Sequence, residues 1–418
     1  MSSFSIPLSG LAASQEALNI ISNNLANLNT PGYKDQTANF QSLFYQNLGT
    51  TGAGDPIQVG AGSEVGSIST TFTNGSVTST GVPSDVAITG NGFFITQSAN
   101  GTVQYTRAGD FTVNSSGQLV TSDGETVMGY PAVNGVVNQS GTLVPIQVGQ
   151  SAISPPAATT TVAQQTNLDA SATAGTVYST PLTVYDSLGE AHVLTFNFTN
   201  TGPGAWSYTV TLPAADTGGT GNPTTVATGN LTFDSNGNLA TPTGGSITGI
   251  KIAGLADGAA TMNLTWGLTG PGGSSLLTQV ASPSATTTTT QNGYGSGLLQ
   301  SYTVEPDGTV EGQFSNGQVQ ALGQIALANF ANPNGLQLTG SGNYAPTLAS
   351  GAAVVGAPNS GGLGTLTGGA VEASNVDIST EFTNLIITQR GFEADARVIT
   401  TLDTITSDTI NLQATPGN

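Results

Sequence analysis

The sequence predicts a mainly β protein with an α-helix at each end and two β-rich domains, one of them inserted in the other. At both ends of the 418-residue chain, apolar residues recur at alternating spacings of three and four, which is a helical pattern. Between the ends, segments rich in Gly, Thr and Ser alternate polar with apolar residues, which is typical of strands and turns. Two Pro/Thr-rich stretches, 155–161 and 283–290, divide this middle part.

The N-terminal helix is expected to begin at Ser3 or Ser5, either of which can cap it, and to end near Asn29. Pro31 and Gly32 follow, and they cannot continue a helix. The stripe lies on one seam of this helix and includes two polar residues: Phe4, Leu8, Leu11, Gln15, Leu18, Ser22 and Leu25.

The C-terminal helix is expected to follow the capping-box-like residues 374–377 and to run to about Leu412. Asp377 and Glu381 suit the positive end of its dipole. Such a helix would be on the order of 50 Å long, which is too long for packing inside a small domain. Its stripe continues after one slip in register: Phe382, Leu385, Gln389, Phe392, Ala396 and Ile399, then Leu402, Ile405, Thr409 and Leu412.

A single terminal amphipathic helix usually covers a sheet of its own domain. Two such helices, with polar Gln15, Ser22 and Gln389 in their seams, favour pairing in an assembly instead. The apolar seam residues are therefore the candidate polymerisation residues: Leu8, Leu11, Leu18, Leu25, Phe382, Leu385, Phe392, Ile399, Leu402, Ile405 and Leu412.

The middle of the chain repeats one hairpin pattern in residues 111–119, 231–239 and 302–310, and more loosely in 182–189. Each segment has two apolar residues one apart, then turn formers and a glycine. This order suits a type I turn closed by a glycine at positive φ.

These patterns give a domain plan. Residues 1–35 and 370–418 are expected to form the terminal helical polymerisation domain, and residues 36–70 an extended linker. Residues 71–150 and 290–365 are expected to form an inner β domain, into which an outer β domain, 160–285, is inserted. Insertion at a surface loop costs little structurally because chain ends tend to lie close together.

Charge is scarce and unbalanced. Only 7% of the residues are charged, where soluble domains average about 25%. The 24 acidic and 5 basic residues give a net charge of −19. Five cations cannot line up the phosphate contacts of a nucleic-acid site, and an anionic membrane surface is disfavoured for the same reason.

The chain has no cysteine, and no apolar run approaches the roughly 20 residues of a membrane-spanning helix. A cleavable secretory signal is not expected, because the first positive charge is Lys34. The sequence therefore predicts a cytoplasmic protein unless it leaves by a route that does not cleave its N-terminus.

Catalytic chemistry is not indicated, and no cofactor or metal site is expected. His192 is the only histidine and lies in a strand-like alternation, and no G-x-S-x-G motif occurs. Neither Lys34 nor Lys251 follows a glycine, so a P-loop is absent. Residues 234–238 lack the flanking helices and the glutamate of a calcium loop, which leaves a hairpin turn.

Residues 22–34, SNNLANLNTPGYK, resemble the N-terminal signature of the bacterial flagellar rod and hook proteins, an axial protein family. Residues 369–377, GAVEASNVD, and 388–403, TQRGFEADARVITTLD, resemble its C-terminal block, although the family usually has Asn where this chain has Asp395. Residues 90–94 and 105–111 are similar to its first β segment. The signature residues are Asn27, Asn29, Thr30, Pro31, Gly32, Tyr33, Asn375, Asp377, Gln389, Arg390 and Phe392.

The middle of the chain, in residues 185–189, 291–298 and 314–336, resembles the hook members of this family. The resemblance implies a structural subunit that self-assembles into a curved flexible tube, a universal joint carrying motor torque from rod to filament. It also implies that the terminal helices form the inner tube.

The implied partners are further copies of the chain, the distal rod protein, the hook cap and hook–filament junction proteins, and the flagellar type III export apparatus. The implied location is extracellular, in the basal body and hook, after export without a cleaved signal peptide. Nucleic-acid binding and membrane insertion are not expected.

The alternatives are a distal rod or hook-associated axial protein and, from another class, a secreted β-rich adhesin. A hydrolase that depends on His192 is a third possibility.

Overall fold

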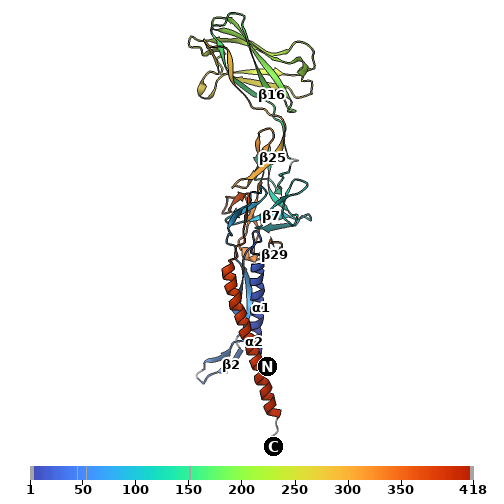
Figure 1. The fold of residues 1–418 in the computed structure, drawn as a ribbon, viewed down its shortest axis with the longest axis vertical. Helices are drawn as coiled ribbons and strands as arrows, with labels where there is room; N and C mark the ends of the chain where they lie inside the picture. The colour runs from blue at the N-terminus through green and yellow to red at the C-terminus, as the bar shows by residue number, and fades with distance from the viewer. Residues whose placement is uncertain (1–3, 45, 53, 150–151, 415–418) are drawn as a thin grey trace. The chain divides into compact units, whose positions relative to one another are not determined.

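A computed structural model describes residues 4–44, 46–52, 54–149 and 152–414 (Figure 1). The chain divides into two compact units. Unit 1 comprises residues 1–149, 301–312 and 320–418, and unit 2 comprises 150–300 and 313–319. The predicted fold class is confirmed, because both units are rich in strands and both helices lie at the chain ends. The finer domain bounds remain a prediction.

The two long helices are α1 (Ser5–Ala26) and α2 (Ile378–Ala414). α1 begins at the second of the two expected serines, and the other, Ser3, lies outside the described residues. Asp377 caps α2, because its Oδ1 accepts the backbone N–H of Thr380 at 2.9 Å. The expected capping by Ser374 is wrong: the helix starts at Ile378, and Ser374 Oγ accepts only the nearby N–H of Val376 at 3.4 Å.

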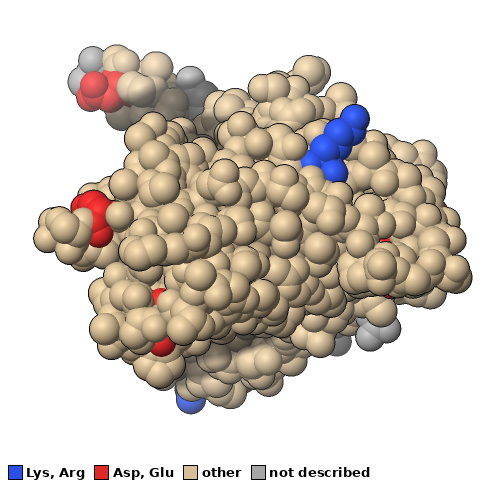
Figure 2. Space-filling view, turned by 90° about the horizontal axis from the view of Figure 1, so that it is seen from above, with Lys and Arg blue, Asp and Glu red and all other residues tan. Residues whose placement is uncertain are grey.

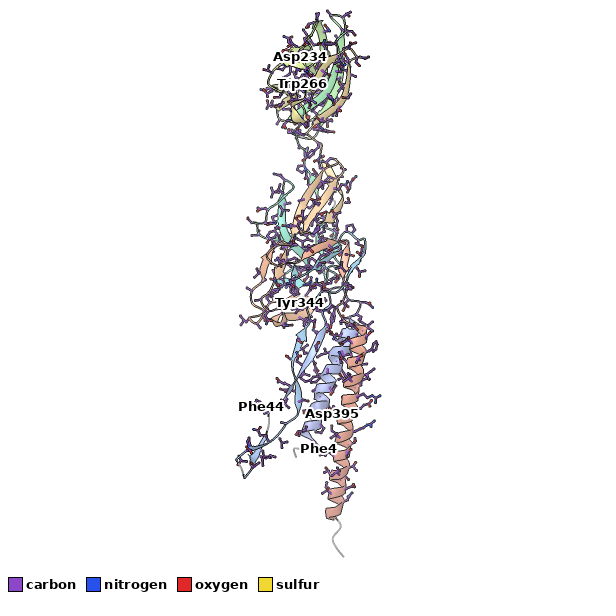
Figure 3. The ribbon with its side chains drawn as sticks, turned by 90° about the vertical axis from the view of Figure 1, so that its left-hand side faces the viewer. Phe4, Phe44, Asp234, Trp266, Tyr344 and Asp395 are labelled. Atoms are coloured by element: carbon purple, nitrogen blue, oxygen red, sulfur yellow. The ribbon has the colours of Figure 1, made fainter. Side chains whose placement is uncertain are left out.

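α1 and α2 pack side by side and run antiparallel (Figure 1). A Cβ atom on Gly10 would lie 2.7 Å from Asp395 Oδ2, and one on Gly391 would lie 3.8 Å from Ser14 Oγ. Residues further along α1 therefore face residues nearer the start of α2, as in an antiparallel pair. Asp395, where the family usually has Asn, is half-buried against α1 (Figure 3).

The buried face of α1 differs from the predicted seam. Its buried residues are Pro7, Ala13, Ala17, Ile20, Ile21 and Asn24. The small alanines and the two isoleucines lie on the side that packs on α2 and on strands β1 and β4. The seam leucines lie beside this face, where they are only partly buried or exposed.

Residues 36–70, expected as an extended linker, form two antiparallel pairs in the described part. Strand β1 (Gln36–Ser42) pairs with β4 (Ser63–Thr70), and β2 (Gln46–Thr50) pairs with β3 (Pro56–Val59). The strands of this segment satisfy one another's backbone hydrogen bonds.

The β part of unit 1 centres on the strand order β27-β11-β7-β8-β30-β29. Two apolar clusters fill it, one around Phe94 and Phe111 and one around Phe93, Phe330 and Tyr344. The rings meet edge to face, with centroids 5.0 Å apart for Phe94 and Phe111.

The strands assigned wholly to unit 1 are, besides β1–β4, β5 (Val77–Ser79), β6 (Val86–Thr89), β7 (Phe93–Gln97), β8 (Val103–Thr106), β9 (Thr112–Val113), β10 (Leu119–Val120), β11 (Thr126–Val133), β12 (Val136–Val137), β13 (Val144–Pro145), β28 (Leu327–Asn329), β29 (Gln337–Gly340), β30 (Asn343–Ala345), β31 (Val354–Gly356), β32 (Thr365–Gly368) and β33 (Ala370–Glu372). Strands β25 (Gly297–Val304), β26 (Thr309–Phe314) and β27 (Val319–Ile325) contribute residues to both units. A 3-10 turn, η3 (Pro333–Gly335), precedes β29.

The glycines of the repeated hairpin pattern have the predicted backbone. Gly117, Gly237, Gly308 and Gly189 have φ values of +79°, +78°, +84° and +88°. In the first of these turns the N–H of Gly117 donates to the carbonyl of Asn114 at 2.9 Å. The sequence pattern therefore identified the turns correctly.

Unit 2 contains two five-stranded sheets. One has the order β16-β17-β18-β19-β20, and the other has β21-β22-β15-β23 with β24 beside β15. A single apolar cluster takes residues from both sheets and includes the buried Trp206 and Trp266; Figure 3 labels Trp266. Trp266 meets Phe196 and Tyr208 edge to face at centroid distances of 4.9 and 5.3 Å.

The elements of unit 2 are β14 (Ile153–Ser154), β15 (Thr161–Asp169), β16 (Val177–Tyr185), β17 (Ala191–Gly202), β18 (Ala205–Leu212), η1 (Ala214–Thr217), β19 (Thr224–Phe233), β20 (Leu239–Thr241), β21 (Ser246–Ile252), β22 (Met262–Gly267), η2 (Pro271–Gly273), β23 (Leu277–Val280) and β24 (Ala285–Gln291).

Trp266→Ala should destabilise unit 2 by about 3–5 kcal/mol, because it removes the ring that joins the two sheets and leaves a cavity. Urea unfolding followed by the fluorescence of Trp206 measures the change. Val193→Ala in β17, where the side chain is exposed, should shift stability by no more than about 0.5 kcal/mol. Equal effects of the two substitutions would contradict the assigned core.

Candidate assembly site: the helix pair and its polar junction

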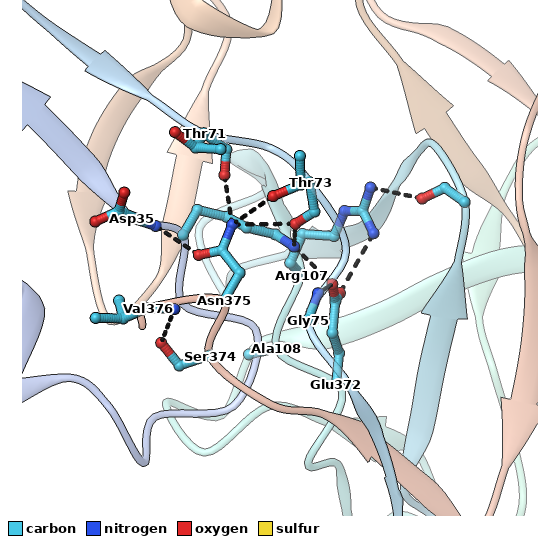
Figure 4. A network of polar contacts seen from close by, with 12 residues as sticks. Asp35, Thr71, Thr73, Gly75, Arg107, Ala108, Glu372, Ser374, Asn375 and Val376 are labelled. Carbon is cyan, nitrogen blue, oxygen red and sulfur yellow. Dashed lines mark hydrogen bonds and ion pairs between the residues drawn. The ribbon is translucent and has the colours of Figure 1, made fainter. Parts of the chain in front are cut away.

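A buried ionic group joins three distant parts of unit 1. We name Lys34, Arg107 and Glu372 the polar junction (Figure 4). Lys34 Nζ lies 2.6 Å from Glu372 Oε1, and Arg107 Nη1 lies 3.3 Å from Glu372 Oε2. All three residues are at most 2% exposed. The junction therefore ties the segment after α1 and the segment before α2 to the β part of the unit.

Backbone groups complete the hydrogen bonding of the polar junction. Lys34 Nζ donates to the Thr73 carbonyl at 2.9 Å, and Arg107 Nη2 donates to the Gly90 carbonyl at 2.8 Å. The N–H of Gly75 donates to Glu372 Oε1 at 2.9 Å. Burial lowers the pKa of Lys34 and of Arg107, an effect that the adjacent Glu372 carboxylate opposes.

Gly32 shows why the signature turn needs glycine. Its φ is +68°, and a Cβ atom there would lie 2.4 Å from the backbone carbon of Arg107. Its N–H donates to the Glu372 carbonyl at 2.8 Å. The turn after α1 therefore rests directly on the backbone of two polar-junction residues.

Asn375 holds the start of the C-terminal segment in place. Its Oδ1 accepts the N–H of Asp35 at 2.7 Å, and its Nδ2 donates to the carbonyls of Thr71 and Thr73 at 2.7 and 3.1 Å (Figure 4). One side chain thus connects three segments that are far apart in the sequence.

Asn24 makes the corresponding connection on α1. Its side-chain amide nitrogen lies 2.6 Å from Asp35 Oδ1 and 3.1 Å from Glu381 Oε2 on α2. Its Oδ1 accepts the Tyr33 hydroxyl at 3.1 Å. Burial, together with the carboxylates of Asp35 and Glu381, raises the pKa of Tyr33 to about 12.

The other signature residues fall into two groups. Asn27 lies at the end of α1, where its Oδ1 accepts the hydroxyl of Thr30 at 3.0 Å, and Pro31 is half-buried. Asn29, Gln389 and Arg390 are exposed. Gly32, Tyr33 and Asn375 therefore form one group, around the polar junction. Asn29, Gln389 and Arg390 form the other, on the exposed surface.

The candidate polymerisation residues differ in how far the monomer covers them. Half-buried are Leu11, Leu18, Leu25, Leu385, Phe392, Ile399 and Leu402. Leu8, Phe382 and Ile405 are exposed, and the side chain of Leu412 lies outside the described residues. The role of these residues in polymerisation remains a prediction.

Sequence reasoning quoted Lys34, Arg107 and Glu372 inside motifs without assigning them a role. The available signal was the scarcity of cations: four of the five basic residues stand in family motifs, which marks each of them as a candidate for a specific ion pair. No helix among the described residues is long and apolar enough to span a membrane.

Family models match four segments of the chain. The Flagella basal body rod protein model matches residues 6–34, and the Flagellar basal body rod FlgEFG protein C-terminal model matches 367–412. The Flagellar hook protein FlgE/F/G D1 domain matches 87–169, and the Flagellar basal body protein FlaE D2 domain matches 155–294. A helix pair built from both chain ends, joined to β domains with these matches, defines an axial protein of the bacterial flagellum.

Relatives named "Flagellar hook protein FlgE" match almost the whole chain. The Salmonella typhimurium protein is 38% identical over 98% of this chain and 100% of its own length. The Escherichia coli protein is 36% identical over the same shares, and the Borreliella burgdorferi protein is 34% identical over 97% and 98%. The chain therefore belongs to the flagellar hook protein family. The rod and adhesin alternatives are not favoured.

Among solved structures, the crystal structure of Helicobacter pylori flagellar hook protein FlgE2 is similar, with a TM-score of 0.48 and 15% identity. The match covers 69% of this chain and 98% of that one.

Glu372→Gln should lower the free energy of unfolding of unit 1 by about 3–5 kcal/mol, because it leaves two buried cations without their counter-charge. Urea denaturation followed by far-UV circular dichroism measures the loss. Glu64→Gln is the matched control, since Glu64 is an exposed glutamate whose carboxylate accepts only the amide of Gln41 at 2.7 Å. If the two variants were equally stable, the polar junction would not have the structural role assigned to it.

Proposed function

We propose that this chain is the structural subunit of a flagellar hook and assembles with its own copies into a curved, flexible tube that carries torque from rod to filament. The observation that carries the proposal is the helix pair, whose two members come from opposite ends of the chain and leave large apolar side chains uncovered.

Most of the uncovered apolar side chains lie on α2, and two lie near the start of α1. They are between 42 and 64% exposed: Ile6, Leu8, Ile378, Phe382, Ile386, Ile387, Val398, Ile405 and Ile410. A groove of about 190 Å³ between α1, β1 and α2 is lined by Ala17, Ile20, Ile21 and Ile387, among others. Contiguous exposed apolar surface marks an interaction site. Since the chain belongs to the flagellar hook protein family, the occupant we infer is a second copy.

The paired strands of residues 36–70 extend this apolar surface. Phe44, between β1 and β2, is 93% exposed (Figure 3). Its exposed apolar neighbours in the same segment are Phe40, Leu48, Ile57, Val59 and Ile68. We infer that this segment contacts neighbouring copies and is more than a linker.

The scarcity of charge supports a joint that bends. In Figure 2 the visible face is almost entirely uncharged, with a few separate acidic and basic groups. Charge-assisted hydrogen bonds are strong and directional, so a surface of Ser, Thr, Gly and Asn allows contacts to slide and re-form. We infer that contacts of the inserted domain, 160–285, are small and polar compared with those of the helices.

We infer further that the partners are the distal rod protein, the hook cap, the hook–filament junction proteins and the type III export apparatus. The inferred location is the extracellular hook, reached without cleavage of a signal peptide. No enzymatic activity is proposed.

The purified full chain should form curved tubes of even width, visible by electron microscopy under polymerising conditions. Leu8→Ser combined with Phe382→Ser should abolish tube formation, since both side chains are exposed in the monomer and must be covered on assembly. The monomer's unfolding free energy should change by no more than about 1 kcal/mol, as expected for two exposed positions.

The control for this variant is Val136→Ser, which changes an exposed apolar residue outside the helices. It should polymerise like the unaltered chain. Tubes of normal yield from the double variant would rule out these helix faces as the assembly surface.

Replacing residues 160–285 with a short flexible linker should give polymers that still form but differ in curvature, because the helix contacts remain. Tube curvature in electron micrographs is the readout. A complete failure to polymerise, with the helices intact by circular dichroism, would show that the inserted domain is required for assembly.

A further inference from the structure

The single histidine of the chain lies among three carboxylates in unit 2. His192, near the start of β17, is 5% exposed. Its Nδ1 lies 2.9 Å from Asp216 Oδ2, and its Nε2 lies 3.2 Å from Asp186 Oδ2 and 3.9 Å from Asp257 Oδ2. Both ring nitrogens of the imidazole therefore lie near carboxylates.

The backbone fixes the direction of the Asp186 carboxylate. Asp186 lies in the turn between β16 and β17, and its Oδ1 accepts the N–H groups of Leu188 and Glu190 at 2.8 and 2.9 Å. The other oxygen, Oδ2, is thereby directed at His192. Asp186 is fully buried, so bulk water does not compensate its charge.

The other two carboxylates come from separate loops that the backbone also ties together. Asp216 lies in η1, and Asp257 lies between β21 and β22. The N–H of Ala256 donates to the carbonyl of Asp216 at 2.8 Å, and the N–H of Ala260 donates to Ser187 Oγ at 2.9 Å. Loops from both sheets of unit 2 thus converge on His192.

Positive charge is lacking near this group. Lys251 is the only Lys or Arg in residues 150–300 and 313–319, and it forms no ion pair with any described residue within 4.0 Å. Three carboxylates around one imidazole therefore leave a local excess of negative charge. A bound cation would neutralise it.

We propose that His192 Nε2, Asp186 Oδ2 and Asp257 Oδ2 bind one Zn²⁺ ion, while Asp216 accepts the Nδ1–H of His192. The three ligand atoms lie within 4.8 Å of one another. A tetrahedral ion with ligands at about 2.0–2.1 Å separates them by roughly 3.3 Å, near the observed 3.2 and 3.9 Å. Water takes the fourth position.

The second carboxylate bond of the imidazole distinguishes this group from a chance cluster of acids. A histidine that binds a metal almost always donates its other ring N–H to a carboxylate or carbonyl, which orients the ring. One nitrogen and two oxygen ligands suit Zn²⁺ better than Ca²⁺, which takes six to eight oxygens. The bound ion would fasten loops of both sheets at one end of unit 2.

The test uses the full chain, freed of metal with a chelator and titrated with ZnCl₂ by calorimetry. We expect one Zn²⁺ per chain and a rise in Tm that MgCl₂ and CaCl₂ do not reproduce. Asp257→Asn, at a partly exposed position where the fold should persist, and His192→Gln should each abolish the saturable binding. Asp216→Asn keeps a hydrogen-bond acceptor and should weaken binding by about 10–100-fold.

Asp234→Asn is the matched control, because Asp234 is an exposed aspartate of the same unit whose Oδ1 accepts two turn N–H groups. It should bind Zn²⁺ like the unaltered chain. Absence of saturable binding by the folded chain, or equal binding by the unaltered chain and Asp257→Asn, would overturn the site in favour of a purely ionic histidine–carboxylate group. Neither result bears on hook assembly.

Discussion

Unit 1 depends on one buried carboxylate. Glu372 is the only counter-ion of Lys34 and Arg107 among the described residues, and it lies 338 and 265 residues from them along the chain. In a low-dielectric interior, an unpaired charge costs several kcal/mol of stability. The three charged side chains must therefore be buried together, because leaving one out would leave another charge unpaired. This condition fixes where the chain leaves α1, where it enters α2 and how both meet the β part. The polar junction thereby fixes where the helix pair is attached to the β part, although the two helices are the first and last elements of the sequence.

The helix pair of a single chain leaves part of its apolar surface uncovered. The face of α1 that packs within the monomer carries small residues, Ala13 and Ala17, and Gly10 lies against Asp395. Larger side chains, such as Leu8 and Phe382, stay exposed. Close packing of small residues therefore joins the two helices and leaves these larger apolar side chains exposed. In the β-rich parts, by contrast, large apolar residues such as Trp266 are buried in apolar clusters. Few charged groups lie on their surface.

Local sequence patterns predicted the helices, strands and turns well. They could not predict which residues far apart in the sequence come into contact. The helix period, the glycine turns such as Gly237 and the mainly β class follow from spacing and from φ preferences that neighbouring residues determine. The ion pair between Lys34 and Glu372 and the approach of Gly32 to Arg107 depend on tertiary structure, which spacing does not encode. The face of α1 that is buried within the monomer was not predicted, because Ala17 and Ile20 contribute to it rather than the more obvious seam leucines. His192 looked like an ordinary strand residue because Asp216 and Asp257 reach it from other loops.

The antiparallel register of the helices has a consequence for growth. α2 has 37 residues and α1 has 22, and Gly10 lies opposite Asp395. The part of α2 beyond about residue 400 therefore has no α1 beside it, an overhang of roughly 20 Å at 1.5 Å per residue. The overhang lies at one end of the helix pair only. If copies stack along the helices as proposed, each copy that covered the overhang of the one before would present its own in the same direction, and the stack would have a polarity set by its subunit.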